Sequence, residues 1–299
     1  MPRTLLFGTL LLLALGLVGC QAGAPLPPLP DWQSPQGREH AALGQIRELR
    51  SGRVLTKEQL VQRLAQVPRV LVGEQHDNPD HHALELWLLR ALEQQRAQGS
   101  LLLEMLEPVQ QAQVDALKRQ APLPVDLAQA LQWQSGWDWR FYGPIVRHAL
   151  AQPYPVLAAN LNRDEVRAIY RQIPKLEGQR STAGAVTDAL LDQVRNGHCG
   201  LLPESQMPAM LAVQQQRDRR IALRLMQAPT PALLMAGAYH VRKDMGVPLH
   251  LQDLGVEHGT QVLLLAQVGE AVDPGMADYV WFTPAVAEQD YCASMRKGG

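Results

Sequence analysis

Short apolar runs alternate with longer amphipathic segments along most of the chain. The runs are nearly continuous in apolar side chains and end at polar or turn-forming residues, which is typical of strands buried on both faces of a sheet. We predict such strands at residues 69–73, 101–105, 155–159, 231–237 and 261–268.

The amphipathic segments between these runs predict helices. They span residues 79–95, 108–120, 143–152, 163–172, 187–196 and 208–227. Strands separated by helices require right-handed crossovers, so the pattern predicts a largely parallel sheet with helices on both faces. We therefore assign the α/β class, with residues 41–285 as a single domain and residues 286–299 as a C-terminal tail.

Composition narrows the classes of partner. The 299 residues are 46% hydrophobic, which is enough for one sizeable core, and 28 basic side chains face 29 acidic ones. A formal charge of -1 provides no basic field for a phosphate backbone, so we expect no nucleic acid partner. Three cysteines without a CxxC pair argue against a disulfide scaffold and against sulfur-based metal sites.

The first twenty residues resemble a bacterial lipoprotein signal. Arg3 precedes an apolar run at residues 5–18, and the run ends at Leu17-Val18-Gly19-Cys20. The run is too short for a membrane span, which needs roughly 20 residues. The resemblance implies that residues 1–19 are a signal peptide and that Cys20 becomes a lipidated N-terminus. Gln21 in place of Asp favours sorting to the outer membrane.

Proline dominates the residues that follow the signal. Residues 21–38 contain five prolines and show neither a helical nor a strand period. Such a segment is typical of a semi-rigid spacer. We predict that residues 20–40, which include the lipidated cysteine, hold the domain off the bilayer.

Acidic, amide and histidine side chains follow the predicted strands. Glu74 and His76 follow the first strand, Glu104 lies near the end of the second, Asn160 follows the third and His240 follows the fourth. Ligands of open parallel sheets bind at the carboxyl edge, so we expect these side chains to form a site together. Because Glu104 stands in an otherwise apolar run, a cation or an arginine must compensate its buried charge.

Local signals near His76 favour a metal ligand. Asn78 is a good N-cap and Pro79 suits the first helical position, so His76 should lie just before a helix N-terminus. The positive end of that helix favours neutral imidazole, which is the form that coordinates metals. The candidate ligands of a divalent metal are Glu74, His76, Glu104 and His240.

Two further histidines lie on the same predicted helix. His81 stands four residues before Glu85, and His82 follows it. One of the two imidazoles could therefore pair with a carboxylate on that helix instead of contributing to the site.

Seven segments occur in one order, and together they resemble the ChaN family of haem-binding, iron-regulated lipoproteins, within the larger group that includes the Tiki proteases and erythromycin esterases. The segments are GEQHDNPDHH (73–82), LLLEM (101–105), WDWRFYGPI (137–145), AANLNR (158–163), HCGLLP (198–203), QQRDRRIA (215–222) and GAYHVRKDMGVPLHL (237–251). None is specific alone, but the set spans nearly the whole mature chain. The resemblance implies an α/β fold of this type, haem bound at a site completed by dimerisation, and a role in haem or iron acquisition.

The resemblance also implies a tyrosine ligand to the haem iron and a histidine that contacts the propionates. Tyr142 and Tyr239 lie inside matching segments, and the sequence does not choose between them. A phenolate ligand suits ferric haem. Further candidates for haem contact are His76, His240 and His198, and arginines that could bind propionates bidentately are Arg163, Arg217 and Arg242. His198 could instead only cap a loop, and we assign Met245 to packing.

Aromatic residues are concentrated in one segment, although they make up only 5% of the chain. The segment could wall a planar macrocycle or seal one end of the core. It contains Trp133, Trp137, Trp139, Phe141 and Tyr142.

The remaining cysteines leave one alternative open. Cys199 could pair with Cys292 in an oxidising periplasm, with Cys20 kept for lipid, or the two thiols could stay apart, since the sequence does not fix their distance.

Three functions follow from these features. We favour a haem-binding protein whose partners are haem, the membrane through Cys20, a second copy of the chain and an outer-membrane haem receptor. A metallohydrolase would use the Glu and His residues to hold a divalent cation that activates water for peptide or ester cleavage, although the chain has no HExxH pair. A tethered interaction domain without a small ligand would leave the strand-end residues unexplained.

Overall fold

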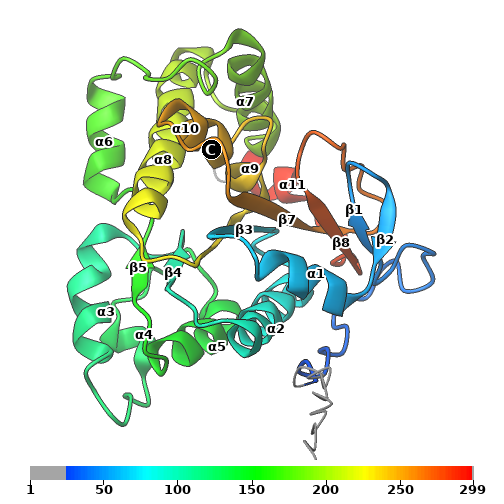
Figure 1. The fold of residues 1–299 in the computed structure, drawn as a ribbon. Coiled ribbons are helices and arrows are strands. Elements are labelled where there is room, and N and C mark those ends of the chain that lie inside the picture. Colours follow the sequence, from blue (N-terminus) through cyan, green and yellow to red (C-terminus); the bar gives the residue numbers. More distant parts are fainter. Residues whose placement is uncertain (1–24, 298–299) are drawn as a thin grey trace, which may run out of the picture.

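The computed structural model describes residues 25–297, and its centre is one eight-stranded sheet in the order β2-β1-β8-β7-β3-β6-β4-β5 (Figure 1). The predicted signal peptide, Cys20 and the first residues of the predicted linker lie outside the described residues. Five neighbouring strand pairs are parallel. Strand β1 pairs antiparallel with both β2 and β8 at one edge. The predicted largely parallel sheet is therefore confirmed.

Five strands match the predicted apolar runs, and each begins and ends within two residues of its prediction. They are β3 (Arg69–Glu74), β4 (Ser100–Leu103), β5 (Val156–Ala158), β6 (Ala232–Gly237) and β7 (Thr260–Gln267). Three strands at the antiparallel side of the sheet were not predicted: β1 (Ile46–Glu48), β2 (Arg53–Leu55) and β8 (Tyr279–Thr283).

The helices cover both faces of this sheet. They are α1 (Lys57–Leu64), α2 (Pro79–Gln95), α3 (Gln111–Leu117), α4 (Leu127–Ala130), α5 (Trp139–Leu150), α6 (Arg163–Arg171), α7 (Gly184–Gly197), α8 (Met207–Gln227), α9 (Ala238–Val241), α10 (Val247–Asp253) and α11 (Tyr291–Lys297), with short 3-10 turns η1 (Pro108–Gln110) and η2 (Glu204–Gln206). Among these described helices, none is long and apolar enough to cross a membrane.

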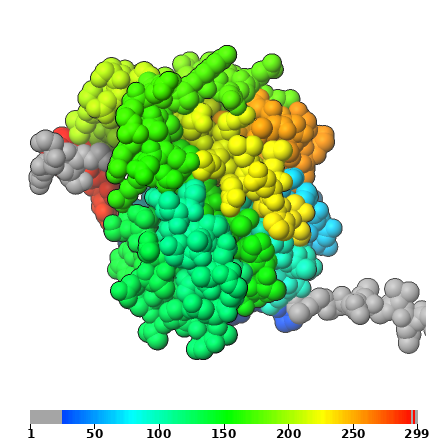
Figure 2. Space-filling view, turned by 90° about the vertical axis from the view of Figure 1, so that its left-hand side faces the viewer, coloured from blue at the N-terminus to red at the C-terminus, as the bar shows by residue number. Residues whose placement is uncertain are grey.

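Alternate residues of the central strands supply two cores. Val70 and Val72 of β3 belong to the cluster that contains the buried side chains of α1, α2 and α5. Leu71 belongs to the cluster on the opposite face, with residues of α8 and α10. Figure 1 shows these two groups of helices on either side of the sheet, and Figure 2 shows the side of the molecule where the surface around α3 lies below α6.

Helix α2 begins where the sequence predicts. The side chain of Asn78 accepts hydrogen bonds from the backbone N–H groups of Asp80 and His81, and Pro79 occupies the first turn. Helix α5 begins four residues earlier than predicted, at Trp139, because the Asp138 carboxylate caps it through the N–H of Arg140. The cap at Asp138 therefore sets the start of α5.

The proline-rich segment differs from a free spacer over its described part. The Asp80 carboxylate accepts hydrogen bonds from the backbone N–H groups of Gln33 and Ser34, at 2.6 and 2.9 Å. The indole of Trp87 donates to the carbonyl of Pro27 at 2.9 Å. Residues 27–34 therefore pack along α2, because that helix offers both an acceptor and a donor to them. The assigned domain boundaries stay a prediction.

A disulfide joins the C-terminal helix to the body of the protein. Cys199, just beyond α7, is bonded to Cys292 in α11. The pairing that the sequence left open is thus formed. It ties residues of the predicted C-terminal tail to a segment 93 positions earlier in the chain.

Candidate functional site

The carboxyl ends of β3, β4 and β6 bring the predicted site residues to one edge of the sheet. Glu74 is the last residue of β3, Glu104 follows β4, and His240 lies on the short helix α9 that follows β6. Strand β6 lies between the other two strands. The backbone N–H of Gly237, at the end of β6, donates to Glu104 Oε2 at 2.9 Å. The strand-end positions therefore converge as the sequence predicts.

Glu74 is the buried centre of a first polar cluster, whose His76 side chain reaches the surface. Its Oε1 atom lies 2.5 Å from His76 Nδ1 and accepts a hydrogen bond from the hydroxyl of Tyr142 at 3.0 Å. Its other oxygen has no hydrogen-bond partner among the described residues. The carboxylate is fully buried, so these two neighbours carry most of the compensation for its charge.

The electrostatics of His76 differ from the prediction. Desolvation lowers the pKa of His76, but the charge and hydrogen bond of Glu74 outweigh it and raise that pKa to about 9. The imidazole is therefore protonated near neutral pH. The prediction that the helix end keeps His76 neutral is therefore not supported, because a carboxylate at 2.5 Å acts more strongly than a helix end.

The other two histidines of α2 have opposite environments. His81 is fully buried, which lowers its pKa well below the usual value, and its ring bonds to the Gln75 N–H and the Thr283 hydroxyl. His82 pairs with Glu85 at 3.1 Å. Desolvation lowers the pKa of His82, but that carboxylate raises it overall. The histidine that pairs with a carboxylate on this helix is thus His82, three residues before Glu85, and not His81.

His240 is the centre of a second cluster. Its Nδ1 atom lies 2.5 Å from Asp218 Oδ1, and its Nε2 atom lies 3.3 Å from Glu104 Oε1. Desolvation lowers the pKa of His240, but the charges of Glu104 and Asp218 raise it. Burial raises the pKa of Glu104, but His240, His76 and Arg217 lower it to about 2. An ionised carboxylate and a protonated imidazole thus stabilise each other.

Asp218 was not among the predicted site residues. It lies on α8, is buried, and orients the ring of His240 from 22 positions earlier in the chain. The surrounding sequence, QQRDRRIA, is typical of a charged, solvent-exposed helix surface. The only signal that could have found it is its membership of a family-like segment.

Close packing joins the two clusters. A Cβ atom on Gly237 would lie 2.8 Å from His76 Nε2, so a larger residue at the end of β6 would displace that ring. Within the described residues, no group of three or more His, Cys, Asp or Glu side chains has an arrangement that could hold a metal ion. The four predicted metal ligands lie together but bond to one another in pairs, so the predicted divalent-metal site is not supported.

A cleft of about 930 Å³ opens above these clusters. Its polar side contains His76, His240, Arg217 and Arg242 together with the carboxylates of Glu74, Glu104, Asp218 and Glu270. Its apolar side includes residues of β7 and the loop after it, among them Leu264, Ala266 and Val272. Tyr239 lies at this cleft with 49% of its surface exposed. The guanidinium of Arg242 lies 5.7 Å from the centre of the Tyr239 ring. The cleft has the size and mixed lining of a small-molecule site.

The two candidate tyrosines have contrasting positions. Tyr142 is 1% exposed, does not line the cleft, and lies near the carboxylates of Glu74 and Glu85. Burial and the charge of Glu74 raise the pKa of Tyr142 far above its usual range. Of the pair, only Tyr239 has an accessible phenol in the cleft.

Most of the aromatic segment seals the core. Trp133, Trp139 and Phe141 pack against the cluster on the α2 and α5 face, and Phe141 stacks on His82 with ring centroids 5.0 Å apart. Trp137 also contacts that cluster, but it lines the cleft with its ring centroid 4.8 Å from that of His76. The core-sealing role is thus found for most of the segment, and a macrocycle against Trp137 stays a prediction.

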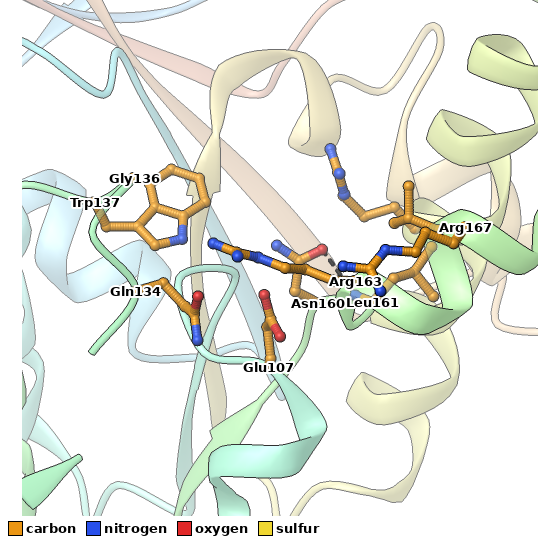
Figure 3. Close-up of a pocket in the computed structure, with 10 residues that line it drawn as sticks. Glu107, Gln134, Gly136, Trp137, Asn160, Leu161, Arg163 and Arg167 are labelled. Carbon is orange, nitrogen blue, oxygen red and sulfur yellow. Dashed lines mark hydrogen bonds between the residues drawn. The ribbon is translucent and has the colours of Figure 1, made fainter. Parts of the chain in front are cut away.

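Three other predicted residues lie outside the cleft. Arg163 lines a neighbouring pocket, with Trp137 and Gln134 on one side of it and Arg163 and Arg167 on the other (Figure 3). His198 follows α7, and its ring bonds to the carbonyl of Val194 at 2.8 Å, as a loop cap would. Met245 is buried against Leu190 and Leu211, in agreement with its assignment to packing.

The fold and the cleft define an α/β protein with a ligand site at the carboxyl edge of its sheet. Residues 60–251 match the family described as "Haem-binding uptake, Tiki superfamily, ChaN", which is more than half of the chain. The chain belongs to this family. No curated protein matches it.

Solved structures extend this comparison. One described as cofacial heme binding to ChaN of Campylobacter jejuni is 30% identical, with a TM-score of 0.72 over 79% of this chain and 95% of that chain. A mutant of the erythromycin esterase EreC in its open conformation is 12% identical, with a TM-score of 0.45 over 82% of this chain and 84% of that chain. The toxin effector domain RRSP from Vibrio vulnificus is 13% identical, with a TM-score of 0.44 over 83% and 42%. The last two are too dissimilar to inform function.

Proposed function

We propose that this protein binds haem in the cleft beside Tyr239 and serves haem or iron uptake at the bacterial cell envelope. The observation that carries the proposal is the exposed phenol of Tyr239 in a cleft of about 930 Å³ with one apolar side. Membership of the ChaN family and the similarity to a Campylobacter protein described as binding heme cofacially support it.

Tyr239 is the iron ligand in this proposal. Haem supplies a ferric iron that takes a phenolate oxygen as an axial ligand. Tyr239 can present its oxygen without moving the core, because about half of its surface is already exposed. Tyr142 is unsuited to this role, since its hydroxyl donates to a buried carboxylate and the neighbouring negative charges oppose its ionisation.

Arg242 and Arg217 are the proposed partners of the haem propionates. Both line the cleft from its polar side. Guanidinium groups bind carboxylates bidentately, so each could hold one propionate. Arg242 pairs with Asp244 at 2.5 Å in the structure, and a propionate would compete with that carboxylate. His240 and His76 line the same cleft, where each is already paired with a carboxylate, so the two arginines are the cations best placed for a propionate.

A second copy of the chain is the proposed cover of the haem. Cofacial binding, as described for the Campylobacter protein, brings two haems face to face. Two copies related by a two-fold axis would place two such clefts opposite each other. A half-exposed ligand side chain in an open cleft suits that arrangement, because the partner would exclude water from the iron.

We further propose that the protein is anchored to the outer membrane through Cys20. The disulfide between Cys199 and Cys292 supports an oxidising compartment and leaves Cys20 as the remaining thiol for lipid. An outer-membrane haem receptor is the corresponding partner. Mass spectrometry of Cys20 in purified membranes tests the anchor, and an unmodified cysteine would contradict it.

A hemin titration monitored by absorbance tests the haem site, with elemental analysis of the purified protein alongside. We expect a saturable Soret shift at one hemin per chain and a rise in oligomeric state when hemin is added. Absence of a saturable shift, together with a stoichiometric divalent metal that a chelator removes, would contradict the proposal and favour a metal-dependent hydrolase.

A further inference from the structure

A second pocket adjoins the haem cleft and has a different chemical character. Its volume is about 450 Å³, and Trp137 and Arg217 line both cavities. Three arginines surround it: Arg163 and Arg167 from α6, and Arg217 from α8. Among the described residues that line it, Glu107 is the one carboxylate. The lining therefore carries two positive charges in excess.

Two of these arginines lack a close ion pair, although Glu104 and Glu107 lie near enough to interact with Arg217 and Arg163 electrostatically. In the described part of the chain, the guanidinium groups of Arg163 and Arg217 form no ion pair within 4.0 Å, although the Arg163 backbone bonds to the Glu107 carboxylate. The Nε atom of Arg217 is buried without a hydrogen-bond partner. Among the described residues, the Arg217 guanidinium makes one long polar contact, 3.5 Å to the side-chain oxygen of Gln214. Arg167 pairs with Asp164 at 3.1 Å, but both side chains are mostly exposed. Exposed pairs of this kind contribute little.

The remaining groups around the pocket limit what it can accept. The side chain of Asn160 is already engaged with the Glu104 carbonyl and the Leu161 N–H. The indole face of Trp137 and the amide of Gln134 lie opposite Arg163 (Figure 3). Guanidinium groups that lack partners offer several N–H donors in a fixed fork, which matches the oxygens of a carboxylate or a phosphate. An anion with two negative charges would therefore balance the excess charge of this pocket.

We propose that this pocket binds a small dianion, a dicarboxylate or a phosphate, between Arg163 and Arg217. The site does not rest on haem binding, because Arg163 does not line the haem cleft. Arg163 is the specific marker of the pocket, whereas Arg217 belongs to both cavities. A dianion bound there would lie directly beside the haem cleft.

Isothermal titration calorimetry of the purified, haem-free protein tests the proposal. Separate titrations with succinate and with inorganic phosphate show whether the pocket prefers a dicarboxylate or a phosphate. Succinamide serves as the neutral control. We expect saturable binding of one of the two anions at one per chain, no binding of succinamide, and an affinity about tenfold or more weaker in Arg163→Gln. Arg171→Gln, on the exposed end of the same helix, should bind as the wild type does.

Circular dichroism verifies that both variants fold. Absence of saturable binding of either anion by the wild type would overturn the proposal, as would equal binding by Arg163→Gln. A hemin titration gives an independent readout, in which Arg163→Gln should match the wild type. If Arg163→Gln weakens hemin but not hemin dimethyl ester, and neither small anion binds, the pocket serves a haem propionate and the separate dianion site is wrong.

Discussion

The hydroxyl of Tyr142 donates a hydrogen bond to Glu74 Oε1 across 3.0 Å and joins helix α5 to the end of β3. Both side chains are buried, and their positions differ by 68 in the sequence. The bond satisfies one oxygen of a carboxylate whose other oxygen lacks a hydrogen-bond partner among the described residues. Tyr142 therefore lies behind the site and holds Glu74 in place, which is why we propose Tyr239 and not Tyr142 as the iron ligand.

Replacing Tyr142 with Phe should destabilise the protein without changing its affinity for haem. Loss of a hydrogen bond to a charged, buried group costs about 1.5–3 kcal/mol, so urea unfolding should show a decrease of that size. Tyr154→Phe is the matched control, because Tyr154 donates to Glu93 at 2.6 Å away from the cleft. Hemin titrations of both variants should overlay the wild type. A loss of tyrosinate bands in Tyr142→Phe would make Tyr142 the ligand.

The stability contributed by the pair of Glu74 and His76 should depend on pH. Since the pKa of His76 is raised from 6.5 to about 9, this contribution is complete below about pH 6.5 and is lost as the pH rises through about 9. The difference in unfolding free energy between the wild type and His76→Asn should therefore shrink between about pH 6.5 and 9.5. Urea unfolding across this range measures it, and a constant difference would refute the raised pKa.

Removal of the disulfide should loosen the C-terminal helix. The double variant Cys199→Ser with Cys292→Ser should lose about 2–4 kcal/mol of unfolding free energy, because the bond closes a long loop. Hydrogen exchange should increase first in residues 286–297. An unchanged exchange rate in that segment would show that other contacts hold α11 in place.

Replacing Arg242 with Gln should weaken haem binding while keeping the iron ligand. Loss of one charged pair with a propionate predicts an affinity about tenfold or more lower. Hemin dimethyl ester, which lacks the propionate charges, should bind the variant and the wild type equally. An equal loss for both ligands would indicate that Arg242 acts on the cleft itself, and the propionate assignment would then fail.

The sequence predicts the parts of the fold that depend on local signals. Asn78 and Pro79 define the start of α2 because capping needs only neighbouring residues. The apolar runs predict five strands, since burial on both faces demands continuous apolar side chains. Strands β1 and β2 have three residues each, too few to show a period, and β1 pairs with β8 far along the chain.

The site is less predictable, because its chemistry depends on contacts between distant segments. Strand ends indicate Glu74, Glu104 and His240, and the fold brings them together. Neither the raised pKa of His76 nor the role of Asp218 follows from spacing, since each depends on which side chain packs alongside. The choice between Tyr142 and Tyr239 likewise depends on burial, which the motif positions do not reveal.

The spectrum of the Tyr239→Phe variant with bound hemin tests the central claim most directly. Wild-type protein and Tyr142→Phe should show the charge-transfer bands of tyrosinate-ligated ferric haem and the matching resonance Raman modes, and Tyr239→Phe should lose both. Circular dichroism should show that all three proteins are folded. If Tyr239→Phe retains the tyrosinate signature, Tyr239 is not the ligand, and the proposed placement of haem in this cleft is contradicted.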